Sequence, residues 1–312
     1  MPAVTPEHLL DLPVLTETEG PPRPVQSIVT AQQTLEGGGF PVYRPFPQPG
    51  ADVGVTDPFL MLDEMGPIVY GPGEAKGAPD HPHRGFETVT YLLDGAFEHR
   101  DSSGGGGLLR GGDTQWMTAG AGLVHSEMPT AEMQRDGGLM HGLQLWVNLP
   151  RTDKFTSPRY QDLTGDRLTL LRSDDGRALV RLVAGELGGH AGPGSTHTPI
   201  VYTHATLEPG ARLSLAWPDV FNALAYVLEG SVRLGGDTRV VGPHQLAVLG
   251  HTGETVVVEA DAQSEILLLG GRPIREPVAW YGPFVMNTKQ EILDAIDDYE
   301  AGKLGEIAPE HA

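Results

Sequence analysis

The chain has 312 residues and a formal net charge of −20, with 41 acidic against 21 basic side chains. A surface this acidic repels phosphate backbones, which argues against direct binding of nucleic acid. The chain contains no cysteine, so disulfides, iron–sulfur clusters, thiol nucleophiles and cysteine zinc sites are excluded, and only histidine and carboxylate chemistry remains for a metal.

The first 25 residues are polar and rich in proline, and we expect them to be extended or loosely attached. They lack the basic start and uninterrupted apolar core of a signal peptide. No apolar stretch in the chain approaches the roughly 20 residues needed to span a bilayer. We therefore expect a cytoplasmic protein without a membrane anchor, and a monomer.

From Val25 onward the sequence predicts an all-β protein. The 42 glycines and 27 prolines separate short apolar runs, a pattern typical of many hairpins. Strands are expected over residues 27–35, 39–46 and 87–93, and Asp94-Gly95 is a strong hairpin signal. Residues 139–150 form the expected last strand of the first half.

The second half contains a weak echo of the first, which indicates one β-barrel unit that has been duplicated. In this alignment Tyr91 corresponds to Tyr226 and Gly95 to Gly230. The expected division is an N-terminal extension (1–25), a first barrel (26–150), a second barrel (151–275) and a C-terminal strand and helix (276–312).

The C-terminal region departs from the β pattern. Thr288 and Glu291 have the spacing of a capping box. Ile292, Ile296 and Tyr299 follow at the spacing of one helix face, which predicts an amphipathic helix ending near residue 302. We expect this helix only to pack, after a strand at residues 283–287 that lays the tail back on a barrel.

Four side chains in the first half have the spacing of a metal site. His81 and His83 lie two residues apart, so on a strand both rings leave the same face. His125 and Glu127 repeat this arrangement, and two antiparallel strands can aim both pairs at one point. A lone His-x-His is more often an ordinary pair of strand residues, but four buried titratable groups at one place are too costly without a cation.

The expected cofactor is one divalent metal ion. Three imidazoles and a carboxylate without thiolate suit Fe, Mn, Ni, Cu or Zn. A closed structural zinc site usually contains cysteines, so an open site is favoured. Fe(II) is the preferred candidate because related histidine–carboxylate sets serve non-haem iron oxygenases.

Other polar and aromatic residues are weaker candidates. Glu87 lies four residues after His83 and is the alternative to Glu127 as carboxylate ligand, with a structural role otherwise. Gln115 either orients a ligand or substrate or makes a strand hydrogen bond. The remaining residues are expected in structural places: His99 and His141 on strand faces or behind the ligands, Trp116 and Trp146 in the core, and His197, His204, His244 and His251 at the surface or in loops.

Five long stretches between about residues 25 and 300 resemble the pirin family, bicupins of the cupin superfamily. They are DPFLMLDE (from Asp57), HPHRGFETVTYLLDG (from His81), GGDTQWMTAGAGLVHSEMP (from Gly111), HGLQLWVNLP (from His141) and REPVAWYGPFVMNT (from Arg275). The resemblance implies two tandem cupin (jelly-roll-like) barrels with a short C-terminal helix.

The resemblance also implies the ligand set. It places one metal, usually iron, in the N-terminal cupin at His81, His83, His125 and Glu127, and leaves the C-terminal cupin empty. The echo agrees, because His81 and His83 align with Ala216 and Pro218. The resemblance favours Glu127 over Glu87, because pirins carry the liganding glutamate two residues after the third histidine, whereas most cupins carry it just after His-x-His.

The activity that the resemblance implies is quercetin 2,3-dioxygenase. A flavonol and O₂ would react at the metal with release of carbon monoxide, and Glu127 would act as ligand and as base. The alternative is a non-enzymatic regulator that binds a protein partner according to the metal's oxidation state. A third possibility is a purely structural metal.

Overall fold

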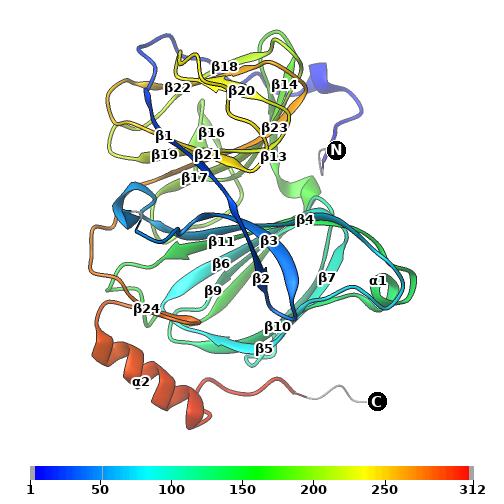
Figure 1. The fold of residues 1–312 in the computed structure, drawn as a ribbon, viewed down its shortest axis with the longest axis vertical. Coiled ribbons are helices and arrows are strands. Elements are labelled where there is room, and N and C mark those ends of the chain that lie inside the picture. The colour runs from blue at the N-terminus through cyan, green and yellow to red at the C-terminus, as the bar shows by residue number, and fades with distance from the viewer. Residues whose placement is uncertain (1–3, 51, 309–312) are drawn as a thin grey trace.

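The computed structural model describes residues 4–50 and 52–308 and contains two stacked β-barrels (Figure 1). The lower barrel in that view comes mainly from the first half of the chain and the upper one from the second half. The expected all-β architecture with a C-terminal helix is confirmed. Within the described ranges, no helix is both long enough and apolar enough to cross a membrane.

The first barrel consists of a seven-stranded and a four-stranded sheet. Their strand orders are β12-β9-β6-β11-β4-β3-β2 and β5-β10-β7-β8. The bounds are β2 Gln32–Glu36, β3 Phe40–Phe46, β4 Phe59–Tyr70, β5 Ala78–His83, β6 Phe86–Asp94, β7 Ala96–Asp101, β8 Gly106–Arg110, β9 Thr114–Thr118, β10 Leu123–Pro129, α1 Ala131–Asp136, β11 Gly138–Asn148 and β12 Arg159–Leu163, with the 3₁₀ turn η2 Val53–Val55.

The second barrel repeats this plan with a seven-stranded and a three-stranded sheet. Their orders are β1-β21-β19-β23-β17-β14-β13 and β18-β22-β20. The bounds are β1 Val25–Thr30, β13 Thr169–Arg172, β14 Ala178–Ala184, β15 Glu186–Leu187, β16 His190–Ala191, β17 Ile200–Leu207, β18 Arg212–Ala216, β19 Asn222–Glu229, β20 Val232–Leu234, β21 Gln245–Leu249, β22 Thr255–Ala260 and β23 Ser264–Gly271, with the 3₁₀ turns η1 Leu9–Asp11 and η3 Gly165–Arg167.

The two barrels exchange edge strands. β1 comes from the first half of the chain but pairs with β21 of the second barrel. β12 follows the first half but pairs with β9 of the first barrel. Sheet membership therefore crosses the divisions at residues 26 and 150 that the sequence suggested, and each barrel is completed by the other half of the chain.

The described part of the N-terminal extension is docked on the second barrel, so of the two alternatives, extended or loosely attached, loose attachment does not hold. Leu15 is fully buried in the core of that barrel, and its N–H donates to the Arg172 carbonyl. Arg23 is also buried, and its guanidinium donates to the carbonyls of Pro218 and Phe221. These two buried side chains hold the segment on the barrel although most of its residues are polar.

The large sheets present opposite faces to different surroundings because side chains alternate along a strand. On β6, Val89 and Tyr91 belong to a hydrophobic layer built from both halves of the chain. Phe86 and Thr90, on the other face, point into the first barrel, where they contact pocket residues. The second barrel is filled instead by its own hydrophobic cluster.

Two buried tyrosines connect the barrels in a reciprocal way. The Tyr91 hydroxyl of the first barrel lies 3.0 Å from Nδ1 of His204 on β17. The Tyr226 hydroxyl of the second barrel donates to Glu64 on β4 at 2.6 Å. The echo aligns these tyrosines, so the layer has approximate twofold symmetry. His204 is fully buried here, and its expected surface or loop position was wrong.

Four further histidines, His141, His244, His251 and His197, lie outside the first barrel's interior and have ordinary partners. His141 and His244 both contact the buried Glu64 carboxylate, at 2.9 and 2.8 Å. His244 lies in a turn, as expected, and stacks on Tyr43. His251 is exposed, and His197 is half-buried and lies 3.7 Å from Asp153.

The C-terminal segment returns to the first barrel (Figure 1), where β24 (Ala279–Tyr281), β25 (Phe284–Met286) and α2 (Lys289–Glu300) pack. The capping box of Thr288 and Glu291 is present. The buried ammonium of Lys154 donates to the carbonyls of Gly85 and Val285, which fixes β25 beside the turn between β5 and β6.

Candidate metal centre

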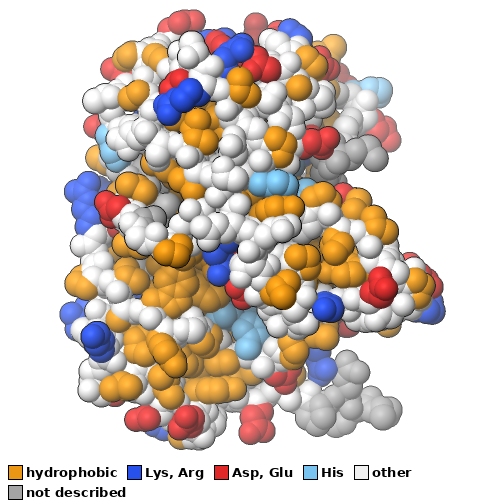
Figure 2. All heavy atoms as spheres, in the orientation of Figure 1, with side chains coloured by type: hydrophobic (Ala, Val, Ile, Leu, Met, Phe, Trp, Pro, Cys, Tyr) orange, Lys and Arg blue, Asp and Glu red, His pale blue; other side chains and the backbone are white. Residues whose placement is uncertain are grey.

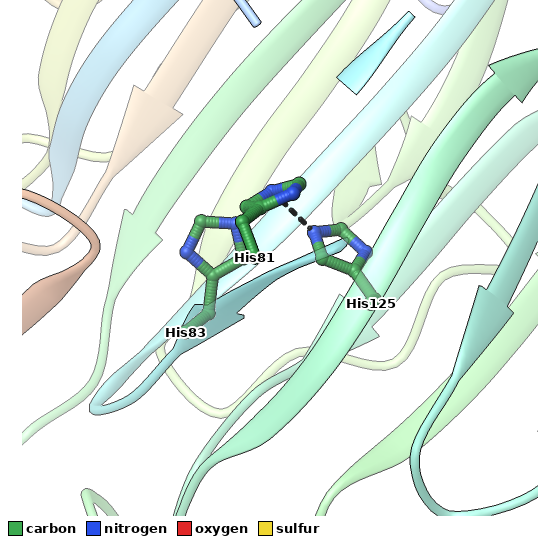
Figure 3. Close-up of side chains that lie close together, drawn as sticks. All are labelled: His81, His83 and His125. Carbon is green, nitrogen blue, oxygen red and sulfur yellow. Dashed lines mark hydrogen bonds between the residues drawn. The ribbon is translucent and has the colours of Figure 1, made fainter. Parts of the chain in front are cut away.

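Three imidazoles converge inside the first barrel (Figure 3). His81 and His83 lie on β5, and His125 lies on the adjacent β10, directly opposite His81 in the antiparallel register. The Nε2 atom of His81 is 3.0 Å from Nε2 of His83 and 2.9 Å from Nε2 of His125. The strand spacing that predicted a common focus is therefore confirmed for these three side chains.

The hydrogen bonds of the rings define which nitrogens face the focus. His81 Nδ1 lies 2.7 Å from the Pro79 carbonyl, and His83 Nδ1 lies 3.4 Å from the Pro283 carbonyl. A carbonyl accepts only, so these Nδ1 atoms carry the protons and the Nε2 atoms present lone pairs. Lone pairs this close repel one another unless a cation lies between them, which fits a divalent metal.

Burial keeps two of the rings in the form that binds metal. Desolvation lowers the pKa of His83 and of His125 well below the ordinary value, and the neighbouring imidazoles lower both further. Both rings are therefore neutral near pH 7, and no proton has to leave them before a metal binds.

Glu127 lies in the same pocket but does not belong to the tight group of ring nitrogens. Its Oε1 accepts a hydrogen bond from the Thr90 hydroxyl at 2.7 Å. Its Oε2 accepts one from the Gln144 amide at 3.2 Å. The carboxylate is thus held at the wall of the pocket, and its role as fourth ligand stays a prediction.

Glu87, the alternative carboxylate, is directed away from the pocket. It follows Phe86 on β6, so alternation places it on the face toward the other barrel, where its Oε1 accepts from Thr118 at 2.7 Å. Complete burial raises its pKa to about 7. Glu87 therefore has the structural role that was its other expectation.

The histidines open onto a pocket of about 590 Å³. Figure 2 shows histidine side chains in a hollow of the lower half, with hydrophobic side chains gathered beside it. The apolar lining comprises Phe40, Met61, Met65, Trp146 and Trp280. One edge is charged, because Arg44 pairs with Asp63 and Glu36.

Of the two tryptophans expected in the core, only Trp116 is there, fully buried between the barrels. Trp146 instead lines the pocket, with its ring 5.2 Å from that of His83 and 5.6 Å from that of Trp280. The difference follows from strand alternation, since Trp146 shares the inward face of β11 with Gln144.

The remaining polar candidates of the interior do not touch the three histidines. Gln115 donates a hydrogen bond to Asp162 at 3.2 Å. Of its two expected roles, this is the hydrogen bond between strands. His99 is buried and stacks on Tyr160, with ring centroids 4.6 Å apart. Its pKa is lowered by desolvation.

Three further residues at this site were not expected from the sequence: Thr90, Gln144 and Trp280. A signal existed for the first two, because a polar residue on the inward face of a buried strand is unusual. Trp280 had no local signal, because it reaches the pocket only when the C-terminal segment folds back on the first barrel.

Comparison with known proteins agrees with this architecture. Residues 39–147 match the pirin family, and residues 202–305 match the pirin C-terminal cupin domain. A pirin-like protein of Solanum lycopersicum is 44% identical over 286 residues, which cover 91% of this chain and 94% of the relative. Pirin of Homo sapiens is 40% identical over 291 residues, 92% of this chain and 95% of the relative.

A solved structure shares the whole arrangement. The crystal structure of a quercetin 2,3-dioxygenase from Acinetobacter baumannii is similar with a TM-score of 0.86 and 38% identity, covering 92% of this chain and 99% of that chain. The chain therefore belongs to the pirin family, with an N-terminal cupin that contains the three-histidine cluster and a C-terminal cupin that does not.

Proposed function

We propose that this protein is a metal-dependent dioxygenase that cleaves flavonols such as quercetin with O₂ at a single metal ion, with Fe(II) as the favoured ion. The observation that carries the proposal is the convergence of three Nε2 atoms on one point at the pocket. The similarity to a protein named quercetin 2,3-dioxygenase supports the choice of substrate.

The residues of the pocket fit the steps of such a reaction. A divalent ion bound there would supply positive charge that favours the deprotonated 3-hydroxyl of a flavonol. Glu127 lies in the same pocket and is the group we assign as base for that proton. Trp146, Trp280 and Met61 offer flat apolar surface for aromatic rings and limit the access of water.

The test is oxygen uptake after quercetin is added to protein reconstituted anaerobically with Fe(II). We expect uptake to follow flavonol loss in the wild type. His81→Ala removes one of the converging nitrogens, so both metal retention and turnover should fall to background.

Glu87→Gln is the matched control, because that carboxyl lies on the opposite face of β6 and should leave metal content and turnover unchanged. Flavonol cleavage that persists in His81→Ala would contradict the proposal. Absence of uptake by iron-loaded wild type would contradict catalysis and favour the regulatory alternative.

A further inference from the structure

A row of polar side chains crosses the interior of the first barrel at one level. The register pairs Asp63 with Gln144, Gln144 with Thr90, Thr90 with Gln115, and Gln115 with Asp162. These residues lie on five neighbouring strands: β4, β11, β6, β9 and β12. All residues of the row except Asp162 are buried or half-buried, so polar groups extend through the barrel's interior.

The second barrel has apolar residues at the three middle positions of this row. Starting from the equivalence of Tyr91 and Tyr226, the strand register gives Ala225 in place of Thr90. Its partners on the neighbouring strands are Leu268 and Ala247, in place of Gln144 and Gln115. The barrel fold itself therefore does not require the polar row.

The middle of the row contacts Glu127. The Thr90 hydroxyl lies 2.7 Å from Glu127 Oε1 and 2.6 Å from Gln144 Oε1, so its single proton is shared between these two acceptors. The Gln144 amide donates to the other carboxylate oxygen at 3.2 Å. Side chains of the neighbouring strands β6 and β11 therefore hydrogen-bond both carboxylate oxygens of Glu127 on β10.

The ends of the row have partners other than Glu127. At one end, Asp63 is almost fully buried and accepts two hydrogen bonds from Arg44. At the other end, Gln115 donates to Asp162 and does not reach Glu127. Among the described residues of the row, only Thr90 and Gln144 have a hydrogen bond to the carboxylate.

We propose that Thr90 and Gln144 are positioning residues that orient the Glu127 carboxylate toward the ion held by the three histidines. This inference rests on the proposed metal site but not on flavonol as its substrate. Hydrogen bonds to a liganding carboxylate fix its orientation, and their loss typically lowers metal affinity 10–100-fold.

The experiment replaces each residue by the one that the second barrel carries. Thr90→Ala and Gln144→Leu remove the two contacts, and both new residues are already accommodated at the same level of a barrel of this fold. Metal retention is measured by competition with a chelator, and the visible spectrum of the Co(II)-loaded protein reports on the coordination. No flavonol is needed for either readout.

We expect each of these two variants to retain metal about 10–100-fold less tightly and to shift the Co(II) spectrum. Gln115→Ala makes the corresponding change in the same row without touching Glu127, and should behave as wild type. Thr90→Ser keeps the hydroxyl and should restore both readouts, which separates positioning from a packing defect. Unchanged or tighter metal retention in Thr90→Ala and Gln144→Leu would overturn the proposal.

Activity gives a second, independent measure. If the wild type cleaves flavonol, Thr90→Ala should lower kcat and leave KM for the flavonol nearly unchanged, because Thr90 does not line the pocket. If the wild type does not cleave flavonol, the proposed substrate fails while the metal and spectral measurements still decide the roles of Thr90 and Gln144.

Discussion

At the scale of single residues, the two glutamates near the histidines lie on different sheets, Glu127 on β10 and Glu87 on the outward face of β6. Glu127 lies at the pocket and is held by two polar neighbours. Glu87 is packed between the barrels, and its second carboxylate oxygen has no hydrogen-bond partner among the described residues. Desolvation by burial raises its pKa to about 7, because it outweighs the hydrogen bond from Thr118 and the charge of Arg159, which lower the pKa.

Glu87 should make stability depend on pH. Its folded-state pKa of about 7 lies above the ordinary 4.5, so the contribution is fully present below pH 4.5 and is lost as the pH rises through 7. The wild type should lose up to about 3 kcal/mol relative to Glu87→Gln between pH 5 and pH 9. Denaturant unfolding of both proteins at these pH values measures this, and parallel pH profiles would contradict it.

At the scale of elements, the C-terminal helix α2 supports one wall of the pocket. Its buried residues Ile292 and Ala295 pack with Phe284 and Met286 of β25. Trp280 and Pro283, from the hairpin formed by β24 and β25, line the metal pocket. Arg84, next to His83, also pairs with Asp298 of the helix at 2.9 Å. The helix therefore holds in place a segment that lines the pocket of the three histidines.

Ile292→Ala should lower the free energy of unfolding by about 2 to 5 kcal/mol, because it leaves a cavity in this cluster. Ile292 is 6% exposed, whereas Leu293, the next residue of the same helix, is 54% exposed. Leu293→Ala is thus the matched control and should change stability by less than about 0.5 kcal/mol. Thermal or denaturant unfolding compares the two, and equal effects would show that α2 is not packed as described.

At the scale of the whole molecule, the two barrels are joined by a layer with an approximate twofold arrangement. In one half Glu64 contacts His141, and in the other His204 lies 2.8 Å from Glu265. By strand register, Glu64 corresponds to His204 and His141 corresponds to Glu265, so the acidic and the basic residue have exchanged places. Three hydrogen bonds, including one from Tyr226, lower the pKa of Glu64 despite its burial. The carboxylate is thus stabilised in its ionised form.

Tyr226→Phe removes one of these hydrogen bonds and should lower the free energy of unfolding by about 1.5 to 3 kcal/mol, as expected for a bond to a charged group. Tyr202 is equally buried in the same layer, but its hydroxyl has no hydrogen-bond partner among the described residues. Tyr202→Phe should therefore be neutral or slightly stabilising. A loss of stability of the same size in both variants would contradict a specific role for Tyr226 at the interface.

The sequence by itself determined the local features of this protein. Alternation along strands depends on neighbours two residues apart, so it fixed the common face of His81 and His83. The capping box and the apolar spacing of the last helix are equally local, and both were found. The echo between the halves predicted two barrels, and the absence of His-x-His from the second copy predicted that the histidine cluster lies in the first.

Only the tertiary structure decided which distant segments meet. Tyr226 and Glu64 are 162 residues apart in the chain, and nothing local indicates that one donates to the other. The exchange of β1 and β12, the burial of His204 and the return of Trp280 to the pocket likewise depend on how the barrels close. These contacts follow from burying the outer faces of two sheets against each other, and local periodicity does not specify the partner of a buried face.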